Sequence, residues 1–415
     1  MRSAEKYAGI EGDDLPNISV VIPVYNSARF LGACLDSLLA QTFSDFELVC
    51  VNDGSTDDSL AILNEYAARD SRVRVVTKRN EGGGAASARN LGLSLAEGIY
   101  VQFLDSDDFF EPDMLAGLVE KARKTDADVV LCGADRYDQR LGRVVSAYEH
   151  LDLASAPSKE PFSYRDCPDR IFQLGNVLAW NRLYRRAFLV EHELCFEPIP
   201  ISDDLYLPAL AMVLAERLAV VDRPFVHYRF NTGVSQVDSI PKHPEAGYAA
   251  NASIVAKMRE CGVYETVKRS WADVSLRMMR AYFDQMTEFQ NIRMLYEVYR
   301  GEILPLLGAE QLTQEDFYDP RLWEWYQMLM NHSLEELLFL SARGYGAKST
   351  TAILRFPVPY DAVQRGSKIV LVGKGLIGRY WYAQLLLSGY CEVVYWAESM
   401  EQIPNIAYDS VLEAK

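Results

Sequence analysis

The N-terminal part of the chain alternates short apolar runs with segments of helical periodicity. The apolar runs have the length of buried strands and cover residues 18–24, 47–51, 73–77, 100–104 and 128–132. Between them, apolar positions recur at helical spacing in residues 27–40, 56–68, 85–96 and 112–124. Strands that alternate with helices are typical of βαβ units, so this region is predicted to form a largely parallel sheet.

Farther along the chain the pattern changes. Residues 134–170 are polar and loop-like, residues 245–345 read as amphipathic helices, and residues 368–378 (KIVLVGKGLIG) read as a strand that runs into a glycine turn. The predicted parts are an N-terminal extension (1–16), an α/β domain (17–240), a helical domain (241–366) and a partial Rossmann-like unit (367–415).

Composition narrows the function classes. The 415 residues carry 42 Lys and Arg against 58 Asp and Glu, a net charge of −16, without a dense basic run. Sequence-independent nucleic-acid binding needs such a basic surface, so nucleic acid is not an expected partner. The seven cysteines form no C-x-x-C pair, and no apolar window has the length of a secretory signal or a membrane span. We expect a cytoplasmic protein, and a surface contact with the inner face of the membrane is compatible with this composition.

Polar residues follow three of the predicted strands. Tyr25 and Asn26 follow the first strand, which ends with Pro23 and Val24; Asp53 follows the second strand, and Asp105, Ser106 and Asp107 follow the fourth. In an open α/β sheet, ligands lie beyond the carboxyl ends of the strands, so these residues should face one another. A planar ring, an amide and several carboxylates suit a nucleotide base, a ribose and a metal-bound diphosphate.

Asp105 and Asp107 form a D-x-D pattern at a strand end. Two carboxylates in that position can share a hard cation such as Mg²⁺ or Mn²⁺, whereas a solvated turn or a helix cap would use the same residues. Gly82–Gly84 and Arg89 stand at the start of a predicted helix, where backbone N–H groups and a guanidinium favour phosphate. The alternative there is a flexible loop with Arg89 paired to a surface carboxylate.

Other polar and aromatic side chains are ambiguous. His227 follows a strand and is a candidate ligand for the metal or the diphosphate, or a structural histidine. Trp180 and Tyr184 lie four residues apart on a predicted helix, as core residues or as a wall for the acceptor. Asp203 and Asp204 precede a predicted helix, either as caps or as catalytic carboxylates.

Four segments together resemble the signatures of glycosyltransferase family 2. They are residues 18–26 (ISVVIPVYN), 51–57 (VNDGSTD), 86–92 (ASARNLG) and 103–108 (FLDSDD), in the order and spacing of the family. A looser similarity continues through residues 180–186 (WNRLYRR) and 202–207 (SDDLYL) to about residue 235, a little over half of the chain. The resemblance implies a GT-A fold, Rossmann-like and nucleotide-binding, for residues 17–240, and transfer from a nucleotide-sugar donor.

The resemblance also implies roles for individual residues. The implied nucleotide-binding residues are Pro23, Tyr25, Asn26, Asp53, Arg89, Asp105 and Ser106. Mn²⁺ or Mg²⁺ would be held by Asp105 and Asp107, and Asp204 matches the usual general base, with Asp203 as its neighbour. Asn52 departs from the family, which commonly has an acidic residue there, so the contact to the base rests on Asp53. Asp203 stands where Glu is more usual, which leaves open which of Asp203 and Asp204 is the base.

These features predict a metal-dependent, inverting glycosyltransferase. A cation on the departing nucleoside diphosphate and one carboxylate at the acceptor hydroxyl imply a single displacement. We expect a UDP-sugar donor and a saccharide or lipid-linked acceptor in cell-surface polysaccharide assembly. One alternative is a nucleotidyltransferase acting on sugar phosphates, which the sequence after the first strand disfavours. The others are a non-catalytic nucleotide-sugar-binding protein and an NAD-dependent oxidoreductase built on residues 373–378 with Glu398, in a unit too short for a complete domain.

Overall fold

The computed structural model divides the chain into two compact units. The residues that it describes are 16–82, 84–232, 240–286, 288–334, 337–338, 358–373, 377–378, 381–382, 384–385, 389–404 and 406–413. One unit contains Met1–Val237 with Ala249–Val274, and the other contains Asp238–Tyr248 with Ser275–Lys415. The domain boundaries at residues 240 and 366 stay predictions.

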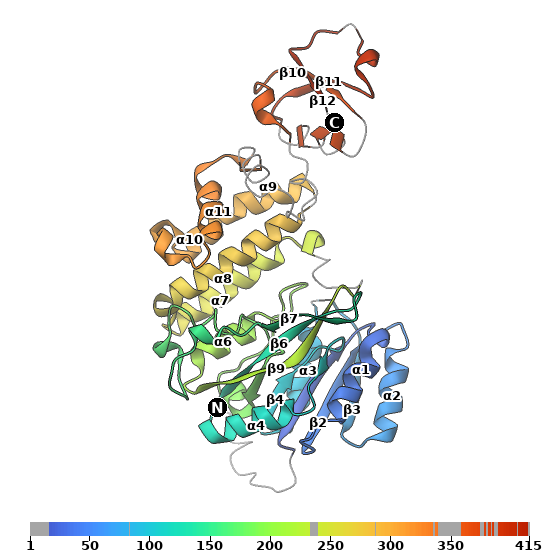
Figure 1. The fold of residues 1–415 in the computed structure, drawn as a ribbon, viewed down its shortest axis with the longest axis vertical. Coiled ribbons are helices and arrows are strands. Elements are labelled where there is room, and N and C mark those ends of the chain that lie inside the picture. Colours follow the sequence, from blue (N-terminus) through green and yellow to red (C-terminus); the bar gives the residue numbers. More distant parts are fainter. Residues whose placement is uncertain are drawn as a thin grey trace. The chain divides into compact units, whose positions relative to one another are not determined.

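Four parallel strands form the first half of the main sheet (Figure 1). In spatial order they are β3 (Val73–Lys78), β2 (Phe46–Asp53), β1 (Ile18–Val24) and β4 (Tyr100–Phe103). Strand β1 is buried along its whole length, as expected for a parallel strand that is covered on both faces. The bounds of these strands agree with the predicted ranges to within a few residues. The predicted α/β fold class is confirmed.

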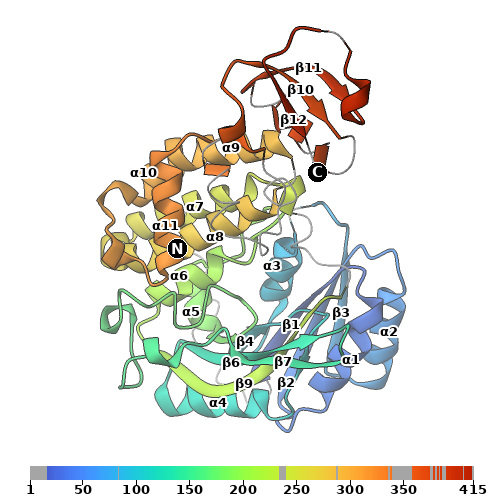
Figure 2. The ribbon, with the colours of Figure 1, turned by 45° about the horizontal axis from the view of Figure 1, so that its top comes forward.

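Helices cover both faces of this half of the sheet (Figure 2). They are α1 (Ala28–Leu39), α2 (Ser59–Arg69) and α3 (Ala86–Leu95). Helices α1 and α2 share a hydrophobic core with alternate residues of β1, such as Val20 and Ile22. Helix α3 lies on the opposite face, where a Cβ on its Gly92 would come within 2.3 Å of Val21. Glycine therefore allows α3 to approach the sheet closely.

The second half of the sheet is mixed. Its strands are β8 (Arg182–Arg185), β6 (Val129–Asp138), β9 (Leu218–Phe230), β5 (Phe109–Phe110) and β7 (Arg143–Glu149), and its helices are α4 (Met114–Thr125), α5 (Arg186–Glu191) and α6 (Tyr206–Leu214). Strand β8 runs antiparallel to both β4 and β6, so β6 and β9 point the same way as β1.

Two sequence predictions fail in this half. Residues 134–170 do not form only loops, because the end of β6 and β7 make an antiparallel hairpin. Trp180 and Tyr184 do not share a helix, since Tyr184 lies in β8 and pairs with both Val101 and Val129. Both side chains are nevertheless buried, as expected of core residues.

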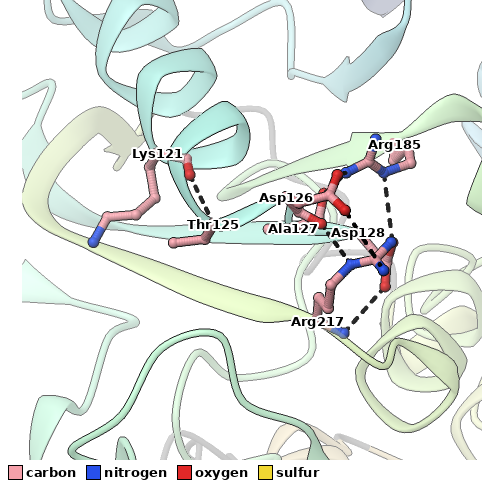
Figure 3. Close-up of polar contacts among 7 residues, drawn as sticks. All are labelled: Lys121, Thr125, Asp126, Ala127, Asp128, Arg185 and Arg217. Atoms are coloured by element: carbon pink, nitrogen blue, oxygen red, sulfur yellow. Dashed lines mark hydrogen bonds and ion pairs between the residues drawn. The ribbon is translucent and has the colours of Figure 1, made fainter.

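An ion-pair cluster joins the amino ends of β6 and β9 to the end of β8, and Figure 3 shows Asp128 between Arg185 and Arg217. An Asp128 carboxylate oxygen lies 2.8 Å from Nη2 of Arg217 and 3.5 Å from Nε of Arg185. Asp126 pairs with the same two guanidinium groups from a more exposed position. The cluster lies at the opposite end of β6 from its carboxyl end, so its contribution should be to stability.

Helices dominate the chain after β9, as the sequence predicted. They are α7 (Ala246–Glu260), α8 (Tyr264–Gln285), α9 (Phe289–Val298), α10 (Leu304–Leu307) and α11 (Pro320–Asn331), with a π-helical turn at Tyr299–Ile303. Within the part of the chain that the structure describes, we find no helix with both the length and the apolar character needed to cross a bilayer.

A small parallel sheet follows near the C-terminus, in the order β11 (Glu392–Ala397), β10 (Lys368–Val372) and β12 (Ser410–Glu413). Strand β12 extends this sheet beyond the single βαβ unit that the sequence predicted. A Cβ on Gly378 would lie 1.6 Å from the carbonyl oxygen of Gly373, so the glycine at this turn is sterically required. Residues 374–376 of the dinucleotide-binding pattern lie outside the described residues.

Candidate active site

The loops that follow β1, β2 and β4 are tied together at one edge of the sheet. Ser55 Oγ accepts a hydrogen bond from the Asn26 N–H (3.1 Å), and the Asn26 side-chain oxygen accepts one from the Thr56 N–H (2.8 Å). The Ser106 and Ser27 hydroxyls lie 2.7 Å apart, which links the β4 loop to the start of α1. The strand ends that the sequence singled out therefore form one continuous rim.

Aromatic and apolar groups of this rim differ in exposure. The Tyr25 side chain is 53% exposed, whereas Pro23 is buried within β1. An exposed ring beside a polar rim is available for stacking against a flat ligand. Asn26, which follows it, has a left-handed backbone (φ 50°) that turns the chain into the loop.

Asp53 is paired with a lysine that the sequence reasoning missed. The Lys78 ammonium lies 2.6 Å from the Asp53 carboxylate, which is almost fully buried. The two residues are register partners at the ends of the parallel strands β2 and β3, so strand alignment was the signal that would have found the pair. The contact with Lys78 holds the Asp53 carboxylate in one orientation at the rim.

Arg89 is buried at the centre of the site and meets carboxylates from two distant segments. Its Nη2 lies 2.8 Å from Asp105, and its Nη1 lies 3.4 Å from Asp203. Burial lowers the pKa of Arg89, but the charges of Asp105, Asp203 and Asp204 outweigh it and hold the pKa above its ordinary value. Arg89 is therefore a permanent internal cation and does not pair with a surface carboxylate.

The D-x-D turn is held by Arg229, a residue at the end of β9 that the sequence analysis did not single out. The Arg229 N–H donates to the Asp108 carboxylate (2.7 Å), and its Nε donates to the Asp107 carbonyl (2.6 Å). Burial and the charge of Asp105 raise the pKa of Asp107 to about 6. Three neighbouring carboxyl groups thus lie on this turn, next to the positive charges of Arg89 and Arg229.

This turn fits a divalent cation by its donor chemistry. Asp105 and Asp107 offer hard carboxylate oxygens, and the other carboxylate oxygen of Asp108 is buried without a hydrogen-bond partner among the described residues. Across the described part of the chain, no group of three or more His, Cys, Asp or Glu side chains is arranged as a complete metal cage. A cation here would therefore take its remaining ligands from diphosphate oxygens or water, as Mg²⁺ usually does.

His227 is engaged elsewhere. Its Nε2 lies 3.0 Å from Glu111, its Nδ1 lies 3.8 Å from Asp135, and its ring stacks on Phe109 at 4.5 Å. Strand pairing between β5 and β9 sets this arrangement, because Phe109 and His227 are register partners. The structure thus gives His227 a hydrogen-bond contact with Glu111 and a stacking contact with Phe109, and these contacts do not support the predicted role as a metal ligand.

Asp203 and Asp204 lie across Arg89 from the D-x-D turn. They do not cap α6, which begins at Tyr206 after Leu205 and has no side-chain cap. Asp203 is 1% exposed and forms an ion pair with Arg89. Burial, together with the charge of Asp203, raises the pKa of Asp204 to about 7. A carboxylate with a pKa near neutrality suits proton transfer at physiological pH.

A glycine of the loop before α3 makes room for this acid pair. Gly84 has φ +67°, and a Cβ there would lie 2.8 Å from the Asp203 carboxylate carbon and 3.0 Å from the Ile199 carbonyl oxygen. Only a residue without a side chain brings this loop so close. The glycine run therefore places Arg89 and Asp203 in the same small volume.

The strand order and the helices on both faces of the sheet are those of a GT-A type fold. Residues 19–191 match the sequence model of the family described as glycosyl transferase family 2. This part of the chain is thus a glycosyltransferase family 2 domain.

Individual relatives show the same similarity. The chain is 34% identical over 238 residues to the uncharacterized glycosyltransferase EpsJ of Bacillus subtilis (strain 168), a match that covers 55% of this chain and 65% of that protein. This match spans less than two thirds of the relative's length. The uncharacterized glycosyltransferase YibD of Escherichia coli (strain K12) is 26% identical over 341 residues, 76% of this chain and 95% of that protein. A solved structure of S. aureus TarS 1–349 in complex with UDP-GlcNAc has a TM-score of 0.51 and 20% identity, and covers 68% of this chain and 91% of that chain.

Proposed function

We propose that this chain is a metal-dependent, inverting glycosyltransferase that moves a sugar from a nucleotide-diphosphate donor, of the UDP-sugar class, to a saccharide or lipid-linked acceptor in cell-surface polysaccharide assembly. The observation that carries the proposal is the bridge from Asp105 through Arg89 to Asp203. It joins a rim suited to a nucleotide with an acid pair suited to activating a hydroxyl.

The donor side binds and orients the nucleotide. Tyr25 stacks on the base over the wall formed by Pro23, and Asp53, fixed by Lys78, accepts hydrogen bonds from its edge. The remaining donor contacts come from the rim residues Asn26, Arg89, Asp105 and Ser106. Asp105 and Asp107 would hold Mn²⁺ or Mg²⁺, which when bound supplies positive charge to the departing diphosphate.

The acceptor side moves one proton. The acceptor oxygen forms a bond to the anomeric carbon while the bond from that carbon to the diphosphate oxygen breaks, and the hydroxyl proton passes to Asp204. We assign the base to Asp204 because Asp203 is committed to Arg89 and the raised pKa of Asp204 favours proton uptake. One displacement, without a covalent intermediate, inverts the anomeric configuration.

A cytoplasmic location, with contact to the inner face of the membrane where lipid-linked acceptors are found, is part of the proposal. All seven cysteines are free, including the exposed Cys195 and Cys261, which matches a reducing compartment.

The test begins with donor choice. A panel of nucleotide sugars, with UDP-GlcNAc first, is screened by thermal shift with Mn²⁺, and a true donor should raise the melting temperature. Transfer from that donor is then followed by NMR of the anomeric proton. Inversion with Mn²⁺-dependent turnover supports the proposal, whereas a retained anomer or stabilisation by no nucleotide sugar contradicts it.

A further inference from the structure

Asn90 follows Arg89 on α3 and makes a two-point contact with one distant residue. Its side-chain nitrogen donates to the Phe196 carbonyl (2.8 Å), and its side-chain oxygen accepts from the Phe196 N–H (2.8 Å). An amide that satisfies both backbone groups of a residue replaces the partner that a neighbouring strand would provide. Asn90 therefore fixes the main chain at Phe196 in position and in orientation.

The segment held in this way leads directly to the acid pair. Residues 194–199 have no helix or strand of their own, and Asp203 and Asp204 follow a few residues later. The Phe196 ring is fully buried, meets Phe103 edge-on at 4.7 Å, and lies 5.3 Å from the Arg89 guanidinium. The segment thus depends on side-chain contacts, and not on a backbone ladder, for its placement.

A second contact holds the same segment from α7. The Ser253 hydroxyl donates to the Glu197 carboxylate at 2.8 Å. Asn90 and Ser253 therefore hold adjacent residues of this segment, Asn90 through the main chain and Ser253 through a side chain.

We propose that Asn90 is the positioning residue that sets where the base Asp204 stands relative to the donor. This inference rests on the proposed function, because it takes Asp204 as the base. Helix α3 carries both Arg89, which faces the donor side, and Asn90, which fixes the acceptor-side segment. One rigid element thereby sets the distance between leaving group and base, and a shift of about 1 Å in such a distance lowers turnover by about 100-fold.

Two variants and a matched control test the proposal. Asn90→Ala removes both hydrogen bonds, and the nearly isosteric Asn90→Asp keeps an acceptor for the Phe196 N–H but sets a carboxylate oxygen against the Phe196 carbonyl. Ser94→Ala is the control on the same helix, since its exposed hydroxyl bonds only the local Leu91 carbonyl. Calorimetry with Mn²⁺ present measures the affinity for UDP. Steady-state assays with the nucleotide sugar chosen by the screen measure kcat and KM. Hydrogen exchange measures the protection of the Phe196 amide.

We expect both Asn90 variants to lower kcat by about 10- to 100-fold and to keep UDP affinity within about threefold. Asn90→Ala should also lose amide protection at Phe196, while Ser94→Ala matches the wild type. Unchanged kcat in a variant that has lost this protection would overturn the proposal. An equal fall in UDP affinity and kcat would also overturn it, because Asn90 would then support the whole domain.

The Asp204→Asn variant shows whether a negative result concerns only the role of Asn90 or the proposed function as a whole. If Asp204→Asn keeps normal transfer, Asp204 is not the base and the proposed mechanism itself fails. If Asp204→Asn is inactive while the Asn90 variants have normal kcat, only the role of Asn90 is wrong.

Discussion

Nη1 of Arg89 lies 3.4 Å from Oδ2 of Asp203, although 114 residues separate them in the chain. The other terminal nitrogen of the same guanidinium bonds Asp105 at 2.8 Å. Arginine is suited to this position because its planar fork reaches two carboxylates and keeps its charge when buried. A single side chain thereby connects the end of β4 with the segment before α6.

Gly84→Ala should disturb the acid pair, and Gly82→Ala provides a matched control. Both glycines have positive φ, but a Cβ at Gly82 meets open space, while a Cβ at Gly84 lies 2.8 Å from Asp203. Backbone strain should lower the free energy of unfolding of both variants by about 1 kcal/mol. Only Gly84→Ala should also lower kcat, which steady-state assays of the two proteins would measure. Equal kcat in the two variants would show that the contact with Asp203 does not matter for transfer.

Asp204→Asn should abolish transfer, retain UDP binding and change the pH dependence of stability. The folded-state pKa of about 7 lies above the unfolded value of about 3.9, so the folded state holds the extra proton between these values. The stabilisation from this carboxyl is present below about pH 4 and is lost as pH rises through about 7.

Asp204→Asn has no carboxyl group at this position, so its stability should not fall as pH rises through about 7. It should be more stable than the wild type by about 1–3 kcal/mol at pH 8, with the difference shrinking toward pH 4. Chemical denaturation at several pH values measures this difference. In the wild type, kcat should fall as pH drops below about 7, because the base becomes protonated. A wild-type kcat that stays flat from pH 5 to 8 would contradict this assignment of the base.

Asp107→Ala should remove the effect of Mn²⁺ on nucleotide binding. In the wild type, burial and the charge of Asp105 raise the pKa of Asp107 to about 6. A cation at this turn should relieve the repulsion between the two carboxylates, so Mn²⁺ should strengthen UDP binding. Calorimetry with and without Mn²⁺ compares the wild type, Asp107→Ala and the control Asp113→Ala, whose carboxylate is partly exposed and pairs with Arg223. The assignment of the metal site fails if Asp107→Ala responds to Mn²⁺ as the wild type does.

Asp128→Ala should destabilise the fold without touching the donor site. It leaves Arg185 and Arg217 without their more buried partner at the amino ends of β6 and β9 (Figure 3). Both arginines are partly exposed, so we expect a loss of about 1–3 kcal/mol in the free energy of unfolding. Asp126→Ala, in which the lost carboxylate is 67% exposed, should lose at most about 1 kcal/mol. Denaturant titration measures the free energy of unfolding of the two variants. A larger loss in Asp126→Ala than in Asp128→Ala would contradict the view that Asp128 is the main partner of the two arginines.

The local sequence pattern was sufficient to predict the first half of the main sheet, which consists of β3, β2, β1 and β4. Strand β1 has the predicted bounds because its run of apolar residues, interrupted only by Ser19, is typical of a buried strand in a parallel sheet. Tyr184 was misassigned to a helix because Trp180 and Tyr184 have helical spacing, whereas the sheet pairs Tyr184 with Val101 and Val129. Strand partners that lie far away in the sequence overrode the local pattern.

The candidate site was only partly predictable for the same reason. Residues that follow strands, such as Asp105, can be located from the topology of a parallel sheet. The partners of these residues cannot, because the contacts from Asn90 to Phe196 and from Arg89 to Asp203 join segments more than 100 residues apart. His227 was proposed as a metal ligand from its residue type, while its actual neighbours depend on how β5 pairs with β9.

The topology of the sheet also has a consequence for the order of folding. In the first half of the main sheet, β1 and β2 pair across a short separation in sequence, as shown by the hydrogen bond between Ser19 and Glu47, which are 28 residues apart. The pairing of β6 with β9 brings together Asp128 and Arg217, which are 89 residues apart, and closing so long a loop is slow. We therefore expect the first half of the main sheet to form first, and Asp203 and Asp204 to meet Arg89 only in the last folding step.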